Sequence, residues 1–337
     1  MIVILKPDIS KKDESEILKE IKKLGYRPHV MHGIERTVIG AIGDERTHQS
    51  LETLVSWPQV ERVVPVQKRF KLVSREGQKF DSVVRVRENR IGGKKFQVMA
   101  GPCSVESEKQ LLTTAEAVKK AGATILRGGA FKPRTSPYEF QGLGEKGLKL
   151  LAKARQETGL SIITELLSEQ HARMVAEYTD IIQIGARNSQ NFQLLIAAAK
   201  TGKPILLKRG LSMKIEEWLL AGEYVLSNNN PHLLFCERGI RTFETYTRNT
   251  LDLSTIPIIK NESHCPIIID PSQGAGRADL ISSLCKGAAA MGADGLLIEV
   301  HPNPAEAWSD GAQQLTLEGF RKLMEELQPF IAAAGRE

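Results

Sequence analysis

The chain has 337 residues, of which 41% are hydrophobic, and its formal net charge is +6. This length suits a large barrel or two domains, and the apolar content is enough for a substantial core. No apolar run approaches the length needed to cross a membrane, and Met1 is followed by a short apolar stretch and Lys6, unlike a secretory leader. We therefore expect a cytoplasmic protein with no membrane partner.

Charge and cysteine content exclude two further classes of protein. The sequence has no long run of like charge and no aromatic residues interleaved with arginines, so nucleic-acid binding is not expected. A modest excess of Lys and Arg is compatible with small phosphorylated ligands. The four cysteines form no CxxC pair, and disulfides are not expected. Three of them lie in or beside apolar runs and are predicted to be buried, whereas Cys103 follows a strand end and a Gly-Pro turn.

Residues 1–70 are predicted to form a small domain of their own. A strand opens this segment, and Asp8 or Ser10 could cap the amphipathic helix that follows. Two alternating strands, a second helix and a last strand complete the order β-α-β-β-α-β, which is typical of a ferredoxin-like α+β fold. His29 and His32 lie on the second predicted strand and are interpreted as surface or interface histidines.

Residues 71–94 are polar and charged, and they end in a predicted hairpin with Asn89 near its turn. We interpret this segment as a connector.

From Lys95 onwards, the pattern changes to alternating strands and helices, and most of the helices end in Gly or Asn. Eight strands are predicted, at residues 95–100, 124–129, 161–166, 181–186, 204–210, 232–239, 266–270 and 295–301. Residues 95–337 are therefore expected to form a (β/α)8 barrel (TIM barrel) of typical size. The alternative is a doubly wound sheet, but no GxGxxG motif follows the first strand.

Functional side chains of such a barrel lie at the C-terminal ends of the strands and in the loops just after them. The residues expected at this rim are Cys103, Arg127, Lys132, Arg134, Glu165, Arg187, Asn188, Lys208, Arg209, Glu237, Arg238, Arg241, Asp270, Gln273, Glu299, His301 and Asp310. The many cations predict one or two densely anionic substrates, because arginine binds phosphate or carboxylate through two parallel hydrogen bonds. The Gly- and Pro-rich loop 128–144 is a candidate cradle for a second phosphate.

Cys103, Glu299 and Asp310 form a second candidate set. Cys103 and Glu299 end the first and last predicted strands, which must pair when the barrel closes, and Asp310 lies in the last loop. A thiolate with two carboxylates suits a divalent ion such as Mn²⁺, Fe²⁺ or Zn²⁺. The spacing alone leaves open a buried thiol beside acids that cap helices or form salt bridges.

Motifs along the whole chain resemble 3-deoxy-D-arabino-heptulosonate 7-phosphate (DAHP) synthase. They are AGPCSVE, LRGGAFKPRTSPYEFQGLGEKGL, IIQIGARNSQNF, PILLKRG, ERGIRTFE, RNTLD and IEVHP followed by SDG. The KPRTSP loop differs from that of the related 3-deoxy-octulosonate 8-phosphate synthases. The front domain is found in one branch of the family. The resemblance implies a transferase that condenses phosphoenolpyruvate with erythrose 4-phosphate and releases phosphate. This reaction opens the shikimate pathway to chorismate and the aromatic amino acids.

The resemblance also implies roles for individual residues. Phosphoenolpyruvate would be held by Arg127, Lys132, Arg187, Lys208 and Arg238. Erythrose 4-phosphate would be held by Arg134 and Thr135, and the metal by Cys103, Glu299 and Asp310. We further expect Lys132 to be a general acid at the aldehyde oxygen and Glu165 to place the water, so that the catalytic set is Cys103, Lys132 and Glu165.

One position departs from the family. The fourth metal ligand of the family is a histidine in the sequence DPSH, whereas this chain has Gln273. A neutral amide oxygen is a weaker ligand and cannot shuttle a proton. Three outcomes are open: a weaker Mn²⁺ or Mg²⁺ enzyme, rescue by His264 or His301, or a disabled site. A disabled site would leave a phosphoenolpyruvate-binding homologue with a regulatory role.

Front domains of this type are linked in the family to feedback inhibition by tyrosine or phenylalanine, acting across subunits. The resemblance therefore implies such an effector and a homotetramer. The alternative is an oligomerisation module that binds no ligand.

Overall fold

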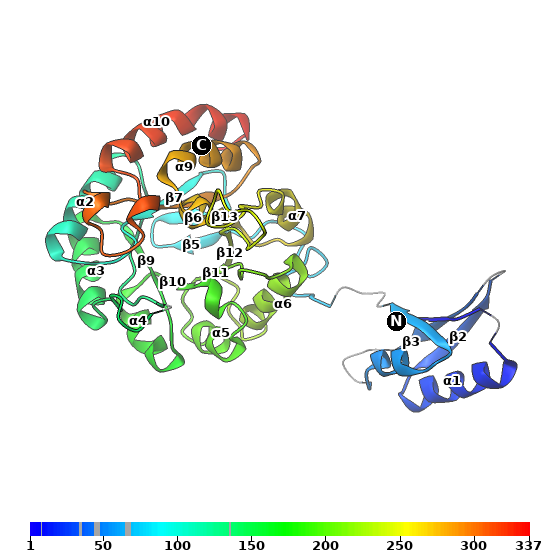
Figure 1. Cartoon of the computed structure of the whole chain (residues 1–337). Coiled ribbons are helices and arrows are strands. Elements are labelled where there is room, and N and C mark those ends of the chain that lie inside the picture. The colour runs from blue at the N-terminus through cyan, green and yellow to red at the C-terminus, as the bar shows by residue number, and fades with distance from the viewer. Residues whose placement is uncertain (8, 34–35, 44–47, 65–68, 135) are drawn as a thin grey trace. The chain divides into compact units, whose positions relative to one another are not determined.

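The computed structural model describes the chain except residues 8, 34–35, 44–47, 65–68 and 135. The described residues form two compact units, Met1–Arg69 and Phe70–Glu337 (Figure 1). Each unit has a buried apolar core of its own. Among the described residues, no helix combines the length and the apolar character that a membrane span requires.

The first unit is a four-stranded antiparallel sheet with one α-helix. Its elements are β1 (Ile2–Leu5), α1 (Lys11–Lys23), β2 (Arg27–His32), β3 (Thr37–Ile42), η1 (Leu51–Ser56) and β4 (Val60–Val64). The strand order β2-β3-β1-β4 confirms the ferredoxin-like prediction. Ser10 caps α1, because its Oγ accepts a hydrogen bond of 3.1 Å from the backbone N–H of Asp13. The other proposed cap, Asp8, lies outside the described residues.

The second predicted helix of this unit is the short 3-10 helix η1. It ends at Ser56 because Pro58 disfavours the helical conformation of the residue before it. His29 and His32 are exposed, as expected of surface histidines.

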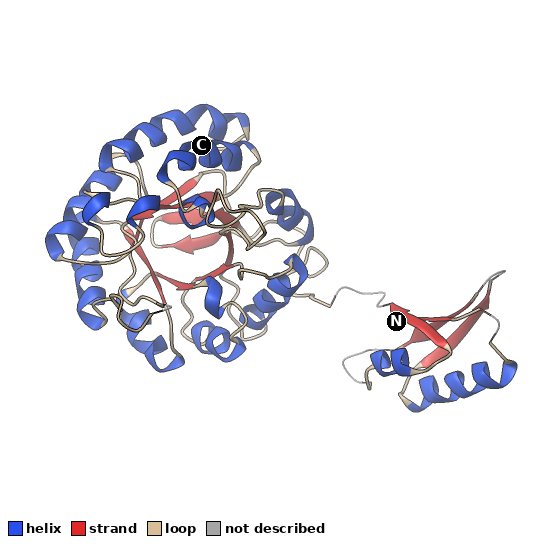
Figure 2. Cartoon of the chain, in the orientation of Figure 1, coloured by secondary structure: helices blue, strands red, loops and turns tan. Residues whose placement is uncertain are grey.

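The second unit is a closed barrel of eight parallel strands, which confirms the (β/α)8 prediction (Figure 2). The strands are β7 (Gln97–Gly101), β8 (Ile125–Arg127), β9 (Ser161–Glu165), β10 (Ile181–Ile184), β11 (Ile205–Lys208), β12 (Leu233–Glu237), β13 (Ile267–Ile269) and β14 (Gly295–Glu299). The barrel closes where β14 pairs with β7. This pairing brings the C-terminal ends of the first and last strands together.

Helices surround the barrel and cover its apolar strands. They are α2 (Glu108–Lys120), α3 (Glu145–Thr158), α4 (Ala172–Tyr178), α5 (Phe192–Ala199), α6 (Ile215–Leu226), α7 (Thr255–Glu262), α8 (Pro271–Ala275), α9 (Ala278–Ala290) and α10 (Leu317–Ala333). Residues 271–275 follow shortly after β13. They form the short helix α8, because Asp270 accepts a hydrogen bond of 2.9 Å from the backbone N–H of Gln273 and Pro271 occupies the first helical position.

A hairpin covers the N-terminal end of the barrel. Its strands are β5 (Val84–Val86) and β6 (Asn89–Ile91), and Val84, Val86 and Ile91 are buried in one cluster with apolar side chains of the barrel strands. Asn89 donates to Thr124 O (3.2 Å) and to Ser161 Oγ (3.1 Å), at the starts of β8 and β9. The hairpin of the predicted connector thus lies within the second unit, and the opposite end of the barrel is left for the functional rim.

Candidate active site

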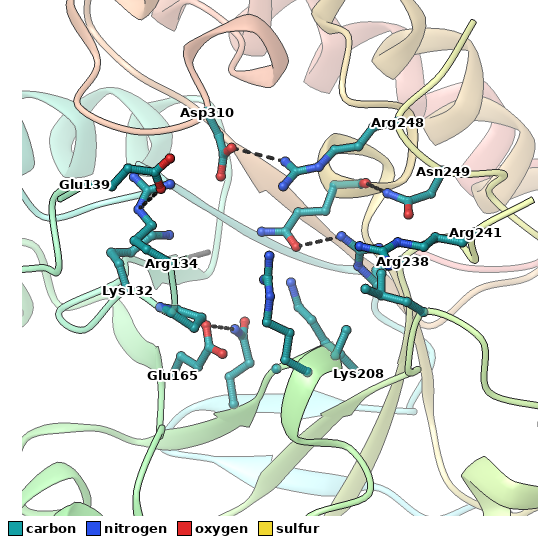
Figure 3. Close-up of a pocket in the computed structure, with 17 residues that line it drawn as sticks. Lys132, Arg134, Glu139, Glu165, Lys208, Arg238, Arg241, Arg248, Asn249 and Asp310 are labelled. Carbon is teal, nitrogen blue, oxygen red and sulfur yellow. Dashed lines mark hydrogen bonds and ion pairs between the residues drawn. The ribbon is translucent and has the colours of Figure 1, made fainter. Parts of the chain in front are cut away.

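A cavity of about 310 Å³ lies at the C-terminal end of the barrel strands. Its lining residues are Lys132, Pro133, Arg134, Glu139, Glu165, Gln183, Gly185, Ala186, Arg187, Lys208, Leu211, Arg238, Arg241, Arg248, Asn249, Gln273 and Asp310. Figure 3 shows labelled cations and carboxylates from several strand ends arranged around one space. The volume is within the range of roughly 300–1,000 Å³ that small-molecule sites occupy.

The deepest cations of the site are buried. Lys208 Nζ lies 2.6 Å from Asp270 Oδ2, and neither side chain is more than 2% exposed. Arg127 Nη1 contacts Glu299 Oε1 (3.2 Å) and donates to Pro102 O (2.7 Å). Among the described residues, Nε of Arg127 and Nε of Arg238 are buried without a hydrogen-bond acceptor. A buried donor that lacks an acceptor is costly, so the Nε–H of Arg238, which lines the cavity, favours a bound anion. Arg127 does not line the cavity and lies beside Glu299 instead.

Beside the cavity, Cys103, Glu299 and Asp310 form the predicted cluster. One candidate ligand atom from each residue lies within 4.8 Å of the other two. Cys103 Sγ is 3.3 Å from Asp310 Oδ2, and Lys132 Nζ is 3.0 Å from Cys103 Sγ. A thiol with two carboxylates is a donor set that fits Mn²⁺, Fe²⁺ or Zn²⁺. The described residues therefore provide three ligands for such an ion.

The surroundings of this cluster shift the pKa of Cys103 and the pKa of Asp310 in opposite directions. Burial raises the pKa of the Cys103 thiol to about 11, the nearby Glu299 adds to this effect, and Lys132 opposes it. Burial would also raise the pKa of Asp310, but Arg248 and Lys132 outweigh it and hold that pKa below its ordinary value. Asp310 is thus ionised more easily than the Cys103 thiol.

Two residues that the sequence did not single out hold the acids in place. Arg248 Nη1 bonds to Asp310 Oδ1 (3.1 Å) and to Gln313 Oε1 (2.8 Å), and the Arg248–Asp310 contact is visible in Figure 3. Gln313 Nε2 donates to Glu299 Oε2 (2.7 Å). Asp310 itself has a left-handed backbone conformation with φ of 48°. Arg248 lies in the RNTLD motif, which was the one signal available for it.

Gln273 lies between the cluster and the cavity. Its Nε2 donates to Glu299 Oε1 (3.3 Å), and its Oε1 accepts from Arg238 Nη2 (3.2 Å). The amide nitrogen, which is no ligand for a metal ion, therefore faces the cluster.

Neither candidate histidine belongs to the cluster among the described residues, so the structure does not support the alternative of rescue by His264 or His301. His301 lies 3.2 Å from Glu106 Oε2 and accepts from the backbone N–H of Asn303 (3.0 Å). His264 bonds to Ser82 Oγ and to Leu72 O, each at 2.8 Å. Both rings are thus engaged in structural contacts.

The remaining predicted residues divide between cavity and scaffold. Glu165, Arg134 and Arg187 line the cavity. Burial raises the pKa of Glu165, although Lys132 and Lys208 lower it. The predicted contact residue Thr135 lies outside the described residues.

Arg209 and Glu237 do not line the cavity, contrary to the expectation for the rim. Arg209 forms ion pairs of 3.0 Å with Glu237 and with Asp252, and Glu237 also accepts from the backbone N–H of Gly239. These contacts join the loop after β11 to the end of β12 and to the loop that follows β12.

A barrel with a cation-lined cavity beside a thiol–carboxylate cluster belongs to the class of TIM-barrel enzymes that act on anionic substrates. The DAHP synthetase I family model matches residues 69–333, and the model of the DAHP synthase ferredoxin-like domain matches residues 1–68. The chain therefore belongs to the DAHP synthetase I family and is an enzyme of the transferase class.

Named relatives agree with this assignment. Phospho-2-dehydro-3-deoxyheptonate aldolase of Thermotoga maritima is 49% identical over 335 residues, which is 99% of each chain. The crystal structure of that protein has a TM-score of 0.96 and covers 100% of this chain and 98% of its own. A 2-dehydro-3-deoxyphosphooctonate aldolase of Caulobacter vibrioides is 33% identical and covers 72% of this chain and 90% of its own.

Proposed function

We propose that the chain condenses phosphoenolpyruvate with erythrose 4-phosphate and water, giving DAHP and inorganic phosphate. The observation that carries this proposal is a cation-lined cavity beside the Cys103 cluster, in which the Nε–H group of Arg238 is buried without an acceptor. The name of the Thermotoga maritima relative supports the same reaction. The reaction would be the first step of the shikimate pathway.

Substrate positioning falls to cations that line the cavity and to the buried Arg127 beside Glu299. Phosphoenolpyruvate would be held by Arg127, Lys132, Arg187, Lys208 and Arg238. Arg134, with Thr135, would hold the phosphate of erythrose 4-phosphate. Fixing both substrates in register removes much of the entropic barrier to their reaction.

The metal would be held by Cys103, Glu299 and Asp310, whose ligand atoms already converge. Held there, a divalent ion would supply Lewis-acid chemistry that makes the aldehyde more electrophilic. Gln273 presents its amide N–H to the same cluster and is not the fourth ligand in this arrangement.

Proton transfers are assigned to two side chains. C3 of phosphoenolpyruvate attacks the aldehyde carbon, and Lys132 donates a proton to the aldehyde oxygen. Burial lowers the pKa of Lys132, but Cys103 and Glu299 outweigh burial and raise that pKa above its ordinary value. The ammonium therefore holds its proton until the aldehyde oxygen gains charge. Water then adds at C2, and Glu165 accepts its proton. The bond from C2 to the phosphate oxygen then breaks as the C2 hydroxyl becomes the ketone carbonyl, and the proton of that hydroxyl passes to the departing phosphate. The cations stabilise this phosphate as it leaves.

A second candidate function is a phosphoenolpyruvate-binding homologue with little catalysis and a regulatory role. The orientation of the Gln273 amide favours it, because a weakly held ion would disable the Lewis-acid step. Both candidates bind phosphoenolpyruvate, so binding alone does not separate them.

The test is phosphate release from phosphoenolpyruvate in the presence of Mn²⁺, with either a four-carbon or a five-carbon aldose phosphate. Erythrose 4-phosphate should support release and the five-carbon sugar should not, because the proposed product has seven carbons. Calorimetric binding of phosphoenolpyruvate without any release would instead support the regulatory homologue.

Three further properties stay predictions from the family resemblance. They are feedback inhibition by tyrosine or phenylalanine through the ferredoxin-like domain, a homotetrameric assembly, and a cytoplasmic location. The match of residues 1–68 to the DAHP synthase ferredoxin-like domain supports the first of them.

A further inference from the structure

The Gln273 carboxamide joins the two halves of the site, which are the ion cluster of Cys103, Glu299 and Asp310 and the cation-lined cavity that contains Arg238. Its Nε2 donates to Glu299 of the ion cluster, and its Oε1 accepts from Arg238 of the anion cavity. The side chain is thus in direct contact with a group from each half.

The partners determine this orientation of the amide. A guanidinium only donates hydrogen bonds and a carboxylate only accepts them. Rotation of the carboxamide by half a turn would place oxygen against the Glu299 carboxylate and N–H against the Arg238 guanidinium. Both hydrogen bonds would become repulsive contacts, so the rotated form is unfavourable while both halves are empty.

The backbone of Gln273 is fixed on both sides. Its N–H donates to Asp270 Oδ1, and its carbonyl accepts from Asn249 Nδ2, each at 2.9 Å. The residue therefore responds to its surroundings by turning its terminal amide, and not by moving as a whole.

Ligands on either side would change this balance. A divalent cation near Glu299 repels an N–H donor and attracts the amide oxygen. An anion on Arg238 accepts the rotated N–H and shields it from the guanidinium. Each ligand thus favours the same rotated amide, and a ligand with different affinities for two states shifts their populations.

We propose that Gln273 is a two-position amide switch that couples divalent-ion binding at Cys103, Glu299 and Asp310 to anion binding at Arg238. This inference rests on the proposed function, because it takes that ion and that anion as the ligands. The ion is held weakly by three ligands until phosphoenolpyruvate binds, and the rotated amide then supplies the fourth. Reciprocity requires the ion to raise the affinity for phosphoenolpyruvate by the same factor.

The test is a titration of the full-length protein with Mn²⁺, in which the free ion is measured by electron paramagnetic resonance. It is done with and without saturating phosphoenolpyruvate, after correction for Mn²⁺ bound by phosphoenolpyruvate alone. We expect about a tenfold gain in Mn²⁺ affinity, within the usual range for allosteric coupling. Calorimetry of phosphoenolpyruvate binding with and without Mn²⁺ gives the reciprocal value.

Variants separate the switch from simple attraction between a cation and a nearby anion. Gln273→Met keeps the length of the side chain but has neither donor nor acceptor, so only the through-space part of the coupling should remain. Gln273→Glu presents oxygen to both sides, so it should bind Mn²⁺ more tightly without phosphoenolpyruvate and show a smaller gain. Gln183→Met, at another glutamine of the same cavity that contacts Glu165 instead of the cluster, is the matched control and should keep the full coupling.

Unchanged coupling in Gln273→Met and Gln273→Glu would overturn the switch, as would a wild-type protein that binds both ligands independently. A wild-type protein that binds neither Mn²⁺ nor phosphoenolpyruvate would instead refute the proposed function.

Discussion

Glu165 ends β9, where burial raises its pKa and Lys132 and Lys208 oppose that rise. A carboxylate with a raised pKa is a better base near neutral pH, as the proposed proton transfer from water requires. The group is protonated at low pH and loses its proton as the pH rises through the raised pKa. The rate should therefore increase with pH along an acidic limb.

Glu165→Gln should lower kcat by about 10²–10⁴-fold, because general base catalysis is lost. The acidic limb of the pH–rate profile should disappear in this variant. Glu139→Gln changes a more exposed carboxylate of the same cavity and should keep the limb. A Glu165→Gln enzyme with near-normal kcat and an intact limb would rule out this role.

The buried pair of Lys208 and Asp270 gives a prediction about stability. Asp270→Asn leaves the Lys208 charge buried without its partner, which should lower the free energy of unfolding by about 3–5 kcal/mol. The double variant with Lys208→Met removes both charges and should recover part of this loss. Denaturant unfolding of the wild type, both single variants and the double variant measures the interaction energy between Lys208 and Asp270. A loss below about 1 kcal/mol for Asp270→Asn would contradict the predicted stabilisation by this pair.

At the residue scale, the strand-end rule located most of the site from the sequence but could not orient every side chain. Lys208 and Arg209 are adjacent, yet Lys208 lines the cavity, whereas Arg209 does not and pairs with Glu237 and Asp252. Successive side chains of a strand point to opposite faces, so one of the two had to point away. Which one depends on the register of the folded barrel, which the sequence does not reveal.

Among the elements, the hairpin of β5 and β6 shows how stability and catalysis are separated. Ile91 is fully buried at the end of the barrel away from the cavity. Ile91→Ala should lower the free energy of unfolding by about 2–5 kcal/mol, through lost burial and the cavity left behind. The value of kcat should stay unchanged.

Val83→Ala is the control for this variant, because Val83 is 49% exposed and should tolerate truncation. Denaturant unfolding and steady-state kinetics measure the two effects. A loss of kcat in Ile91→Ala while the protein remains folded would show that the hairpin also shapes the active site.

The eight barrel strands could be predicted because each is an apolar run with the length of a buried strand. Helix α8 could not, because Pro271 and Gly274 are typical of a turn. Its formation depends on the Asp270 cap and on the contact of Ser272 Oγ with the backbone N–H of Glu299, 2.9 Å away. Tertiary contacts of this kind are invisible in local propensity.

On the scale of the whole molecule, the two units have separate cores, so the barrel should fold without residues 1–69. The solved structure of a truncated form of 3-deoxy-D-arabino-heptulosonate 7-phosphate synthase from Thermotoga maritima covers 79% of this chain with a TM-score of 0.75. A protein that begins at Phe70 should keep phosphate release of the same order as the full chain. It should lose inhibition by tyrosine or phenylalanine.

Phosphate release with and without each amino acid, in both proteins, measures this response. Inhibition that persists in the truncated protein would place the effector site in the barrel.

A site with Gln273 should still catalyse a metal-dependent condensation. The most direct measurement is phosphate release from phosphoenolpyruvate and erythrose 4-phosphate by the full chain, after chelation and then with Mn²⁺, Fe²⁺, Zn²⁺ or Mg²⁺ restored in turn. We predict no release in the chelated protein and recovery with at least one of these ions, strictly dependent on both substrates. Failure of every ion to restore release, in a protein that still binds phosphoenolpyruvate, would contradict the claim.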